Sequence, residues 1–354
     1  MGERDARSIN FAVSERGLET FQQIGLGEAI KQAARILNGR VIHTAACADK
    51  FMYYYGTETY SLRRDKVLAL MYENIIDDPN VDIIDSVDHI EIDRDNAKTT
   101  ANKTNYDVGF IVGADGAFSQ VRQPIIEKQP VSFTQEFFEW RYIEFILESD
   151  DAHQFVHDGN KINFWCAEGA MFAGMPNRDD TLSLMFVFHK HNEDRASRET
   201  LIRRLFTPAQ ADKLISLMTD KISWLTRVLI DKWHYKDKIV LLGDSAHALY
   251  PFYGQEMNLA LEDALELYCA IKNTTTLKDA FERYEHKRRP ETGLLSQIST
   301  DHFYELENKS RSYFSLHNCI VDKWLSKKYP TLWIYSYDAF TTKKMQSQNG
   351  RKHY

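Results

Sequence analysis

The chain has 354 residues, of which 43% are hydrophobic and 12% aromatic, enough to bury a large core in two domains or in one large α/β unit. The formal net charge is −7 with acidic and basic residues interspersed, which argues against nucleic-acid binding, because that binding depends on basic residues that neutralise phosphates. The four scattered cysteines form no CxxC pair, and neither a secretory signal nor the ~18-residue apolar run of a transmembrane helix is visible, so a reducing compartment is the simplest location.

The first third of the chain alternates helix-like and strand-like segments. Within residues 14–35, Leu18, Phe21, Ile24 and Leu26 form a plausible apolar face of a helix. A tyrosine-rich stretch with strand-like composition follows. The predicted segments are, in chain order, a helix over 14–35, a strand over 49–62, a helix over 63–76, short strands over 81–84 and 89–92, and an apolar strand over 107–112.

The middle and the end of the chain have different patterns. The alternating, aromatic-rich residues 130–190 predict an antiparallel sheet. The segments predicted after it are a helical region over 199–219, a buried strand over 238–242, a helix over 255–271, a second helix over 277–287 that ends near Pro290, and helix to about residue 328. Strands that alternate with helices, interrupted by an antiparallel block, indicate an α/β domain with a sheet-rich second domain.

The strongest chemical signal is the segment LLGDSAHALYPFYGQEMN, from Leu241 to Asn258. Its apolar strand ends at Gly243, which allows a ligand to approach the backbone closely, and at Asp244, which can accept hydrogen bonds from sugar or ribityl hydroxyls. A Pro/Gly loop then leads into a helix N-terminus, whose free N–H groups favour electron-rich or anionic groups. A capped strand–turn–helix without a ligand would explain Gly243 and Asp244 alone, but the whole string favours a flavin site.

A second signal lies between Val112 and Arg122, where a strand again ends in a Gly/Asp turn at Asp115 and Gly116. A helix opens near Ser119. A turn type that requires glycine would explain this segment without any ligand. Its position before the first segment, in this order and spacing, strengthens the interpretation as a ligand site.

These two segments resemble the DG and GD motifs of the single-component flavoprotein aromatic hydroxylases. Two segments indicate one family within that group, the kynurenine 3-monooxygenases. Arg7 to Gly17 resembles the family's GRSINLALSxRG segment, and Pro251 to Asp263 resembles its PFFGQGMNAGFED segment. The resemblance extends to about residue 340. The resemblance implies an α/β fold whose FAD-binding domain is Rossmann-like and truncated. The implied domains are 1–125, the first FAD-binding part with substrate-contacting strands; 126–235, an antiparallel-sheet substrate domain; 236–290, the second FAD-binding part; and 291–354, a helical C-terminal region.

The resemblance also implies which residues bind the substrate and the cofactor. Arg40, Tyr55 and Tyr337 would bind L-kynurenine, which is physically reasonable because an arginine fork and tyrosine hydroxyls bind a carboxylate through charge-assisted hydrogen bonds. An ordinary ion pair for Arg40 and core packing for the tyrosines are the alternatives. His247 is interpreted as a packing or loop-fixing residue rather than an acid or base. The residues implied to bind FAD are Arg64, Asp115, Gly116, Gly243, Asp244, Pro251, Gly254, Met257 and Asn258.

The implied chemistry belongs to the cofactor, and no side chain acts as a catalytic group. By resemblance, NADPH reduces FAD, the reduced flavin captures O2 as a C4a-hydroperoxide, and the ring of L-kynurenine attacks its distal oxygen, a step of tryptophan catabolism towards NAD. The protein positions the ring and excludes water. Eukaryotic relatives carry a C-terminal anchor in the mitochondrial outer membrane. No such anchor is visible before Tyr354, so a mitochondrial location with peripheral membrane contact rests on kinship, and a cytoplasmic one follows if the absence is genuine.

The sequence also departs from the family pattern. It contains no GxGxxG, so we expect it to begin at or just past the unit of about 40 residues that binds the pyrophosphate and the adenosine ribose. Glu256 stands where the family has the second glycine of GQG, and we expect it to crowd the flavin ring and oppose its anionic reduced form. Phe303 occupies the position where the family has a substrate-binding asparagine, which would remove a hydrogen bond to the substrate. Trp165-Cys166-Ala167 occupies the position where relatives have Trp-Pro-Arg.

Three hypotheses follow from the match and the departures. The first is a working kynurenine 3-monooxygenase whose N-terminal segment lies outside this sequence. The second is a catalytically impaired paralogue that binds an aromatic amino acid or regulates another protein. The third is a flavin hydroxylase of another aromatic acid. Flavin binding and the response of NADPH consumption to kynurenine discriminate among them.

Overall fold

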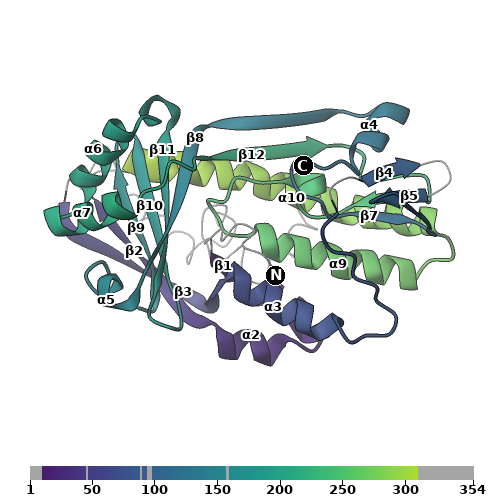
Figure 1. The fold of residues 1–354 in the computed structure, drawn as a ribbon, viewed down its shortest axis with the longest axis horizontal. Helices are drawn as coiled ribbons and strands as arrows, with labels where there is room; N and C mark the ends of the chain where they lie inside the picture. Colours follow the sequence, from purple (N-terminus) through teal and green to yellow (C-terminus); the bar gives the residue numbers. More distant parts are fainter. Residues whose placement is uncertain (1–9, 45–46, 88–89, 94–97, 157–158, 310–354) are drawn as a thin grey trace, which may run out of the picture.

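The structure is a computed structural model that describes residues 10–44, 47–87, 90–93, 98–156 and 159–309. Figure 1 shows two parts side by side, a large sheet with helices on its outer side and a region of smaller sheets and longer helices. The long helix α10 (Leu277–Lys309) crosses from the second part to the first. Within the described ranges no helix is both long and apolar enough to cross a membrane. The α/β fold class predicted from the sequence is confirmed.

The large sheet has eight strands in the order β1-β3-β2-β9-β10-β11-β8-β12. Every neighbouring pair is antiparallel except β2 with β9. Strands β8 to β11 confirm the antiparallel block predicted over 130–190, and β1 to β3 add strands from the start of the chain. Their bounds are β1 Asn10–Val13, β2 Arg35–Thr44, β3 Cys47–Arg63, β8 Phe133–Leu147, β9 Lys161–Ala167, β10 Ala170–Pro176, β11 Leu182–His189 and β12 Ser223–Ile230.

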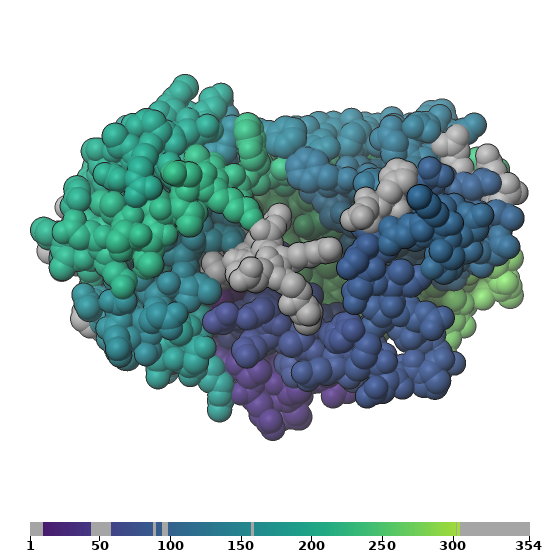
Figure 2. Space-filling model, in the orientation of Figure 1, coloured from purple at the N-terminus to yellow at the C-terminus, as the bar shows by residue number. Residues whose placement is uncertain are grey.

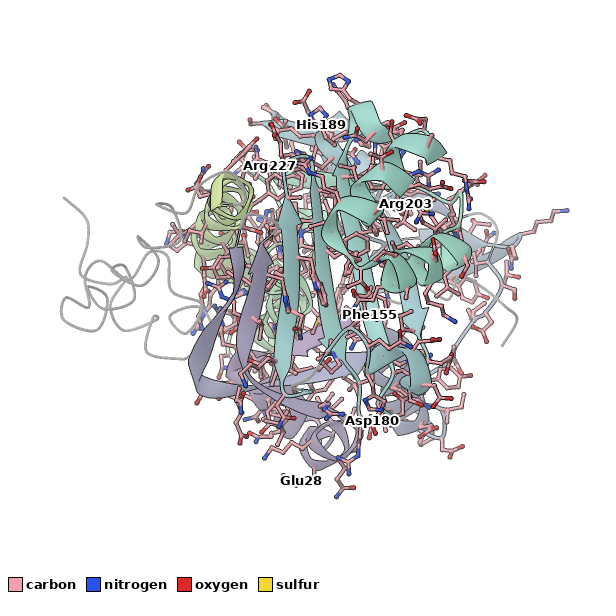
Figure 3. All side chains as sticks on the ribbon, turned by 90° about the vertical axis from the view of Figure 1, so that its left-hand side faces the viewer. Glu28, Phe155, Asp180, His189, Arg203 and Arg227 are labelled. Atoms are coloured by element: carbon pink, nitrogen blue, oxygen red, sulfur yellow. The ribbon has the colours of Figure 1, made fainter. Side chains whose placement is uncertain are left out.

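One face of this sheet forms a core with two helices. Ile143, Phe186 and Phe172 are paired across β8, β11 and β10, and the rings of Phe172 and Phe186 stack with centroids 4.3 Å apart. Helices α6 (Arg195–Leu205) and α7 (Pro208–Leu217) cover this face, as Figure 3 shows from the outside. Side chains one position along each strand point to the opposite face, because strand residues alternate.

The second part contains the strands that carry the two glycine–aspartate motifs. Strands β7 (Ile111–Gly113) and β14 (Ile239–Leu241) pair in parallel, and β13 (His234–Tyr235) pairs antiparallel with β14. Helices α9 (Glu256–Lys272) and α10 lie beside this sheet in Figure 1 and join its apolar core around Val240. Since β7 and β14 are parallel, the turns that follow them lie at the same edge of the sheet.

The remaining elements complete the second part and the flank of the large sheet. In Figure 2 the blue surface of residues 64–87, 90–93 and 98–107 runs from the lower centre to the right of the view, and the teal and green surface of β9 to α7 lies on the left. A third sheet has the order β4-β5-β6. The elements not yet given are α1 Glu15–Gln23, α2 Gly27–Ala33, α3 Arg64–Ile75, β4 Ile90–Asp93, β5 Lys98–Ala101, β6 Thr104–Asp107, α4 Gln123–Lys128, α5 Ser149–Ala152, the 3-10 helix Lys190–Asn192 and α8 Asp244–His247.

Several predicted segments have different bounds in the structure. The helix predicted over 14–35 is two helices, because Gly25 adopts φ +80°, which terminates α1. The strand predicted over 81–84 is wrong: Val81, Ile83 and Ile84 are exposed and lie outside any strand. A short apolar run becomes a strand only where a neighbouring strand accepts its hydrogen bonds.

The helix predicted to end near Pro290 instead continues to Lys309. Proline removes one backbone hydrogen bond from a helix, and it terminates the helix unless packing compensates. Here the residues beyond it are buried: Leu295 and Ile298 pack against Leu249 and its neighbours, and Phe303 enters an aromatic cluster. Tertiary packing therefore outweighs the local preference for a helix end.

Candidate functional site

A cavity of about 480 Å³ lies between the large sheet and the two glycine–aspartate turns. This volume is within the range of small-molecule and cofactor sites. Its wall on one side is the inner face of the sheet, and its wall on the other side is formed by the turns after β7 and β14 and the start of α9. The predicted site residues that line it are Arg40, Arg64, Asp115, Gly116, Asp244, Pro251, Gly254 and Met257.

The turn after β7 is held by Asp115. Its carboxylate accepts hydrogen bonds from the hydroxyl of Ser119 (2.5 Å) and from the backbone N–H groups of Gln120 (2.7 Å) and Val121 (3.1 Å). Gly116 has φ +83° and open space where a side chain would begin. Asp115 therefore stabilises the turn whether or not a ligand is bound. Asp115 and Gly116 also both line the cavity.

The turn after β14 places Asp244 at the first position of the short helix α8. Gly243 adopts φ +60° and ψ −143°, a conformation that favours glycine, and its N–H donates to a carboxylate oxygen of Asp263 at 3.0 Å. Asp244 is exposed to the cavity. Desolvation raises its pKa above the ordinary value, although the nearby positive charges of His247 and Arg64 oppose that shift.

A buried network of charges fixes this turn from behind. Asp263 accepts hydrogen bonds from Gly243, from the ring Nε2 of His247 and from Nε of Arg288 (2.6 Å). Burial alone would raise the pKa of Asp263, but His247 and Arg288 outweigh it and hold the pKa below the ordinary value. His247 is buried and does not line the cavity, so its contacts are those of a residue that positions the loop.

The loop into α9 is joined to the start of the chain by Asn258. Its side-chain N–H donates to the carbonyl of Ala12 at 2.8 Å, and its side-chain oxygen accepts from the N–H of Ser14 at 3.1 Å. A side chain on Gly17 would meet that oxygen at 2.1 Å. Asn258 and Gly243 therefore act from outside the cavity lining, through contacts that position β1, α1 and the loop.

Glu256, at the first position of α9, is one of three lining residues with a buried side-chain oxygen that lacks a partner; Asn10 and Thr226 are the others. One carboxylate oxygen of Glu256 is buried without a hydrogen-bond partner, and the side chain lines the cavity together with Asp244. Burial raises its pKa to about 8, with a further contribution from the negative charge of Asp244. The substitution that departs from the family pattern thus places a mostly protonated carboxyl inside the site at neutral pH.

The sheet wall is largely apolar, with Arg40 from β2 among its lining residues. Phe164, Ala173 and Met185 pair across β9, β10 and β11, and all three line the cavity. Tyr142, from β8, also lines it. These residues were missed in the sequence, because the signal for them is only alternation along strands whose pairing was unknown.

Two predicted substrate residues are not placed by the structure. The backbone of Tyr55 belongs to β3, but its side chain lies outside the described residues, as does Tyr337. Phe303 is only 1% exposed and does not line the cavity. Its ring packs against Phe252 and Trp140, with centroids 4.3 and 4.9 Å away.

The chain resembles known proteins along most of its length. The family model described as "FAD binding domain" matches residues 8–297. A kynurenine 3-monooxygenase of Flavobacterium johnsoniae is 30% identical, covering 95% of this chain and 79% of the relative, and one of Salinispora tropica is 29% identical, covering 97% and 80%. The tetrameric form of 2-methyl-3-hydroxypyridine-5-carboxylic acid oxygenase has the same fold, with a TM-score of 0.74 and 17% identity over 88% of this chain and 85% of that one.

Proposed function

Since this chain belongs to the FAD-binding-domain family and, within it, to the kynurenine 3-monooxygenases, which are flavoprotein aromatic monooxygenases, we propose that it hydroxylates L-kynurenine to 3-hydroxykynurenine with FAD, NADPH and O2. The observation that carries the proposal is one cavity lined by both glycine–aspartate turns and by Arg40. The turns match the cofactor motifs, and the arginine matches the carboxylate of an amino-acid substrate.

The residues around the cavity fit the ring and ribityl part of FAD. Asp244 presents an acceptor for ribityl hydroxyls, Arg64 lies close enough to influence its charge, and Gly116 leaves open space on the same wall. The oxygen of Glu256 that no described residue satisfies offers a bound ligand a further hydrogen-bonding group. Bound FAD, reduced by NADPH, would supply the activation of O2 that hydroxylation requires.

The sheet wall would bind and orient the substrate. Arg40 would bind the carboxylate of L-kynurenine, while the apolar side chains of Phe164 and Met185 would pack against its aromatic ring. Tyr55 and Tyr337 remain proposed partners for the same substrate. The apolar wall would also exclude water, which keeps the reduced cofactor and O2 from reacting unproductively.

The remaining assignments are proposals that rest on kinship. Within the described residues no group of three or more acidic, histidine and cysteine side chains is arranged to hold a metal ion. A mitochondrial outer-membrane location, with peripheral contact, is the location that the eukaryotic relatives suggest. Fractionation of cells that express the full-length protein would test it.

A binding protein without hydroxylase activity is the second candidate function. Glu256 favours it, because a carboxyl group stands where the family has glycine and would crowd the flavin ring. The two candidates differ in one measurable property, the retention of FAD.

The first test is the absorption spectrum of the purified protein after incubation with excess FAD and desalting. We expect a retained flavin band and NADPH oxidation that increases when L-kynurenine is added.

In Arg40→Ala, loss of a hydrogen bond to a charged group should raise the KM for kynurenine roughly 10–100-fold. Arg35→Ala is the matched control, because Arg35 lies on the same strand but pairs with the exposed Asp180 outside the cavity. A colourless folded protein would refute the hydroxylase, and an unchanged KM in Arg40→Ala would refute the substrate assignment.

A further inference from the structure

Glu256 has one carboxylate oxygen that no group of the described residues satisfies. It begins α9, it lines the cavity, and one of its oxygens is buried without a hydrogen bond. A buried polar group that lacks a partner is destabilising, so natural proteins rarely retain one without a function. The position of Glu256 on the cavity wall indicates that its partner is a ligand.

The surroundings decide the protonation state of this carboxyl. The free N–H groups at the start of α9 favour a negative charge, but burial and the neighbouring Asp244 oppose it more strongly, and the pKa rises to about 8. A protonated carboxyl donates one hydrogen bond through its O–H. At neutral pH Glu256 is therefore mainly a donor that needs an acceptor.

The other charged groups of the cavity do not provide that acceptor. Arg64 and Arg40 are donors, and Asp115 is already used by the backbone of its own turn. Asp244 interacts with Glu256 through its charge, and His247 and Asp263 act on Asp244 from behind. The titratable and charged side chains of the lining, from β2, α3, the turn after β7, β8, α8 and the loop into α9, are Arg40, Arg64, Asp115, Tyr142, Asp244 and Tyr253.

We propose that Glu256 donates a hydrogen bond to a ring acceptor of bound FAD and so makes cofactor affinity depend on a proton held by the protein. The flavin ring offers carbonyl oxygens and ring nitrogens as acceptors. The inference rests on the proposed function, because it takes FAD as the ligand of this cavity. It corrects the expectation that Glu256 acts as a negative charge opposed to the reduced ring: a neutral carboxyl does not repel an anionic ring.

The experiment measures the dissociation constant of FAD for the full chain between pH 6 and pH 9, by quenching of flavin fluorescence. The variants are Glu256→Gln, which keeps a donor but cannot ionise, and Glu256→Gly, which removes the side chain. Glu266→Gln is the matched control, because Glu266 lies on the same helix but pairs with Lys287 outside the cavity.

We expect the wild-type dissociation constant to rise by about tenfold between pH 7 and pH 9, because binding linked to one proton weakens tenfold per pH unit above the pKa of the donor. Glu256→Gln should bind nearly as tightly as wild type at pH 7 and change little with pH, while Glu266→Gln should follow wild type. Glu256→Gly should bind more weakly than wild type at pH 7.

Three other results would overturn the inference. An equal pH dependence in wild type and Glu256→Gln would assign the proton to another group and overturn the inference while the proposed function stands. Tighter binding by Glu256→Gly at every pH would show that Glu256 obstructs the cofactor, which also overturns it. If no variant binds FAD at any pH, the proposed function itself fails, and the inference fails with it.

Discussion

The two walls of the cavity are stabilised by different forces. The turn wall, formed by the ends of β7 and β14 with α8 and the start of α9, is fixed by buried charges centred on Asp263 and Arg288. The sheet wall is fixed by the apolar core behind it, where Phe172 and Phe186 stack under α6 and α7. A network of charges is specific in geometry and sensitive to single losses and to pH, whereas a packed core distributes its stability over many contacts.

The largest expected effect comes from breaking the charge network. Arg288 is 1% exposed and pairs with Asp263, Glu262 and Glu291. In Arg288→Ala, Glu262 and Glu291 keep their pairs with Arg16, but the buried Asp263 loses its arginine partner. This loss should lower the free energy of unfolding by about 3–5 kcal/mol in urea denaturation. Lys287→Ala is the matched control, because Lys287 forms an exposed pair and should cost less than about 1 kcal/mol. Equal effects of the two variants would contradict a network role for Arg288.

A smaller, pH-dependent effect should follow from Glu256→Gln. The carboxyl loses its proton near pH 4.5 in the unfolded chain but only near pH 8 in the folded protein. The folded state therefore binds more protons over this window, and stability falls as the pH rises through it. Glutamine removes that loss, so the variant should be more stable than wild type by roughly 2–4 kcal/mol at pH 8, with a difference that shrinks towards pH 4. Urea denaturation of the cofactor-free proteins at both pH values measures this, and a difference independent of pH would argue that Glu256 ionises normally.

The smallest expected effect is on the sheet wall. Ile202, fully buried on α6, contributes to the core behind the sheet. Ile202→Val removes one methylene and should cost about 0.5–1.5 kcal/mol, equally at pH 5 and pH 8, because no charge is involved. Arg203→Ala, on the exposed side of the same helix (Figure 3), should cost less. A pH-dependent effect of Ile202→Val would show that the two walls are coupled.

The same contrast explains what could be predicted from the sequence. The turn wall is encoded by contiguous segments, and its strand, glycine, aspartate and helix follow one another in the chain. For this reason the sequence predicts Asp115, Asp244 and the loop at Gly254 as site residues, and the structure brings them to one cavity. Their roles towards FAD remain proposals, as do the domain boundaries.

The sheet wall could not be predicted in the same way. Phe164, Met185 and Tyr142 come from three strands, and no local pattern indicates which strands are neighbours. The parallel pairing of β2 with β9 joins segments more than a hundred residues apart. The charge network was missed for a related reason: Arg288 carries no motif, and it reaches Asp263 only because α10 continues alongside α9.

The backbone of Gly243 has a consequence for sequence variation. Besides its left-handed conformation, a side chain there would meet the side chain of Ala260 on α9 at 3.1 Å. The two positions thus share one small volume, and neither can enlarge unless α9 moves away from the turn. In an alignment of relatives, residue size at position 260 should therefore be restricted together with glycine at 243, a covariation constraint that arises from steric contact and would persist even in relatives that had lost their activity.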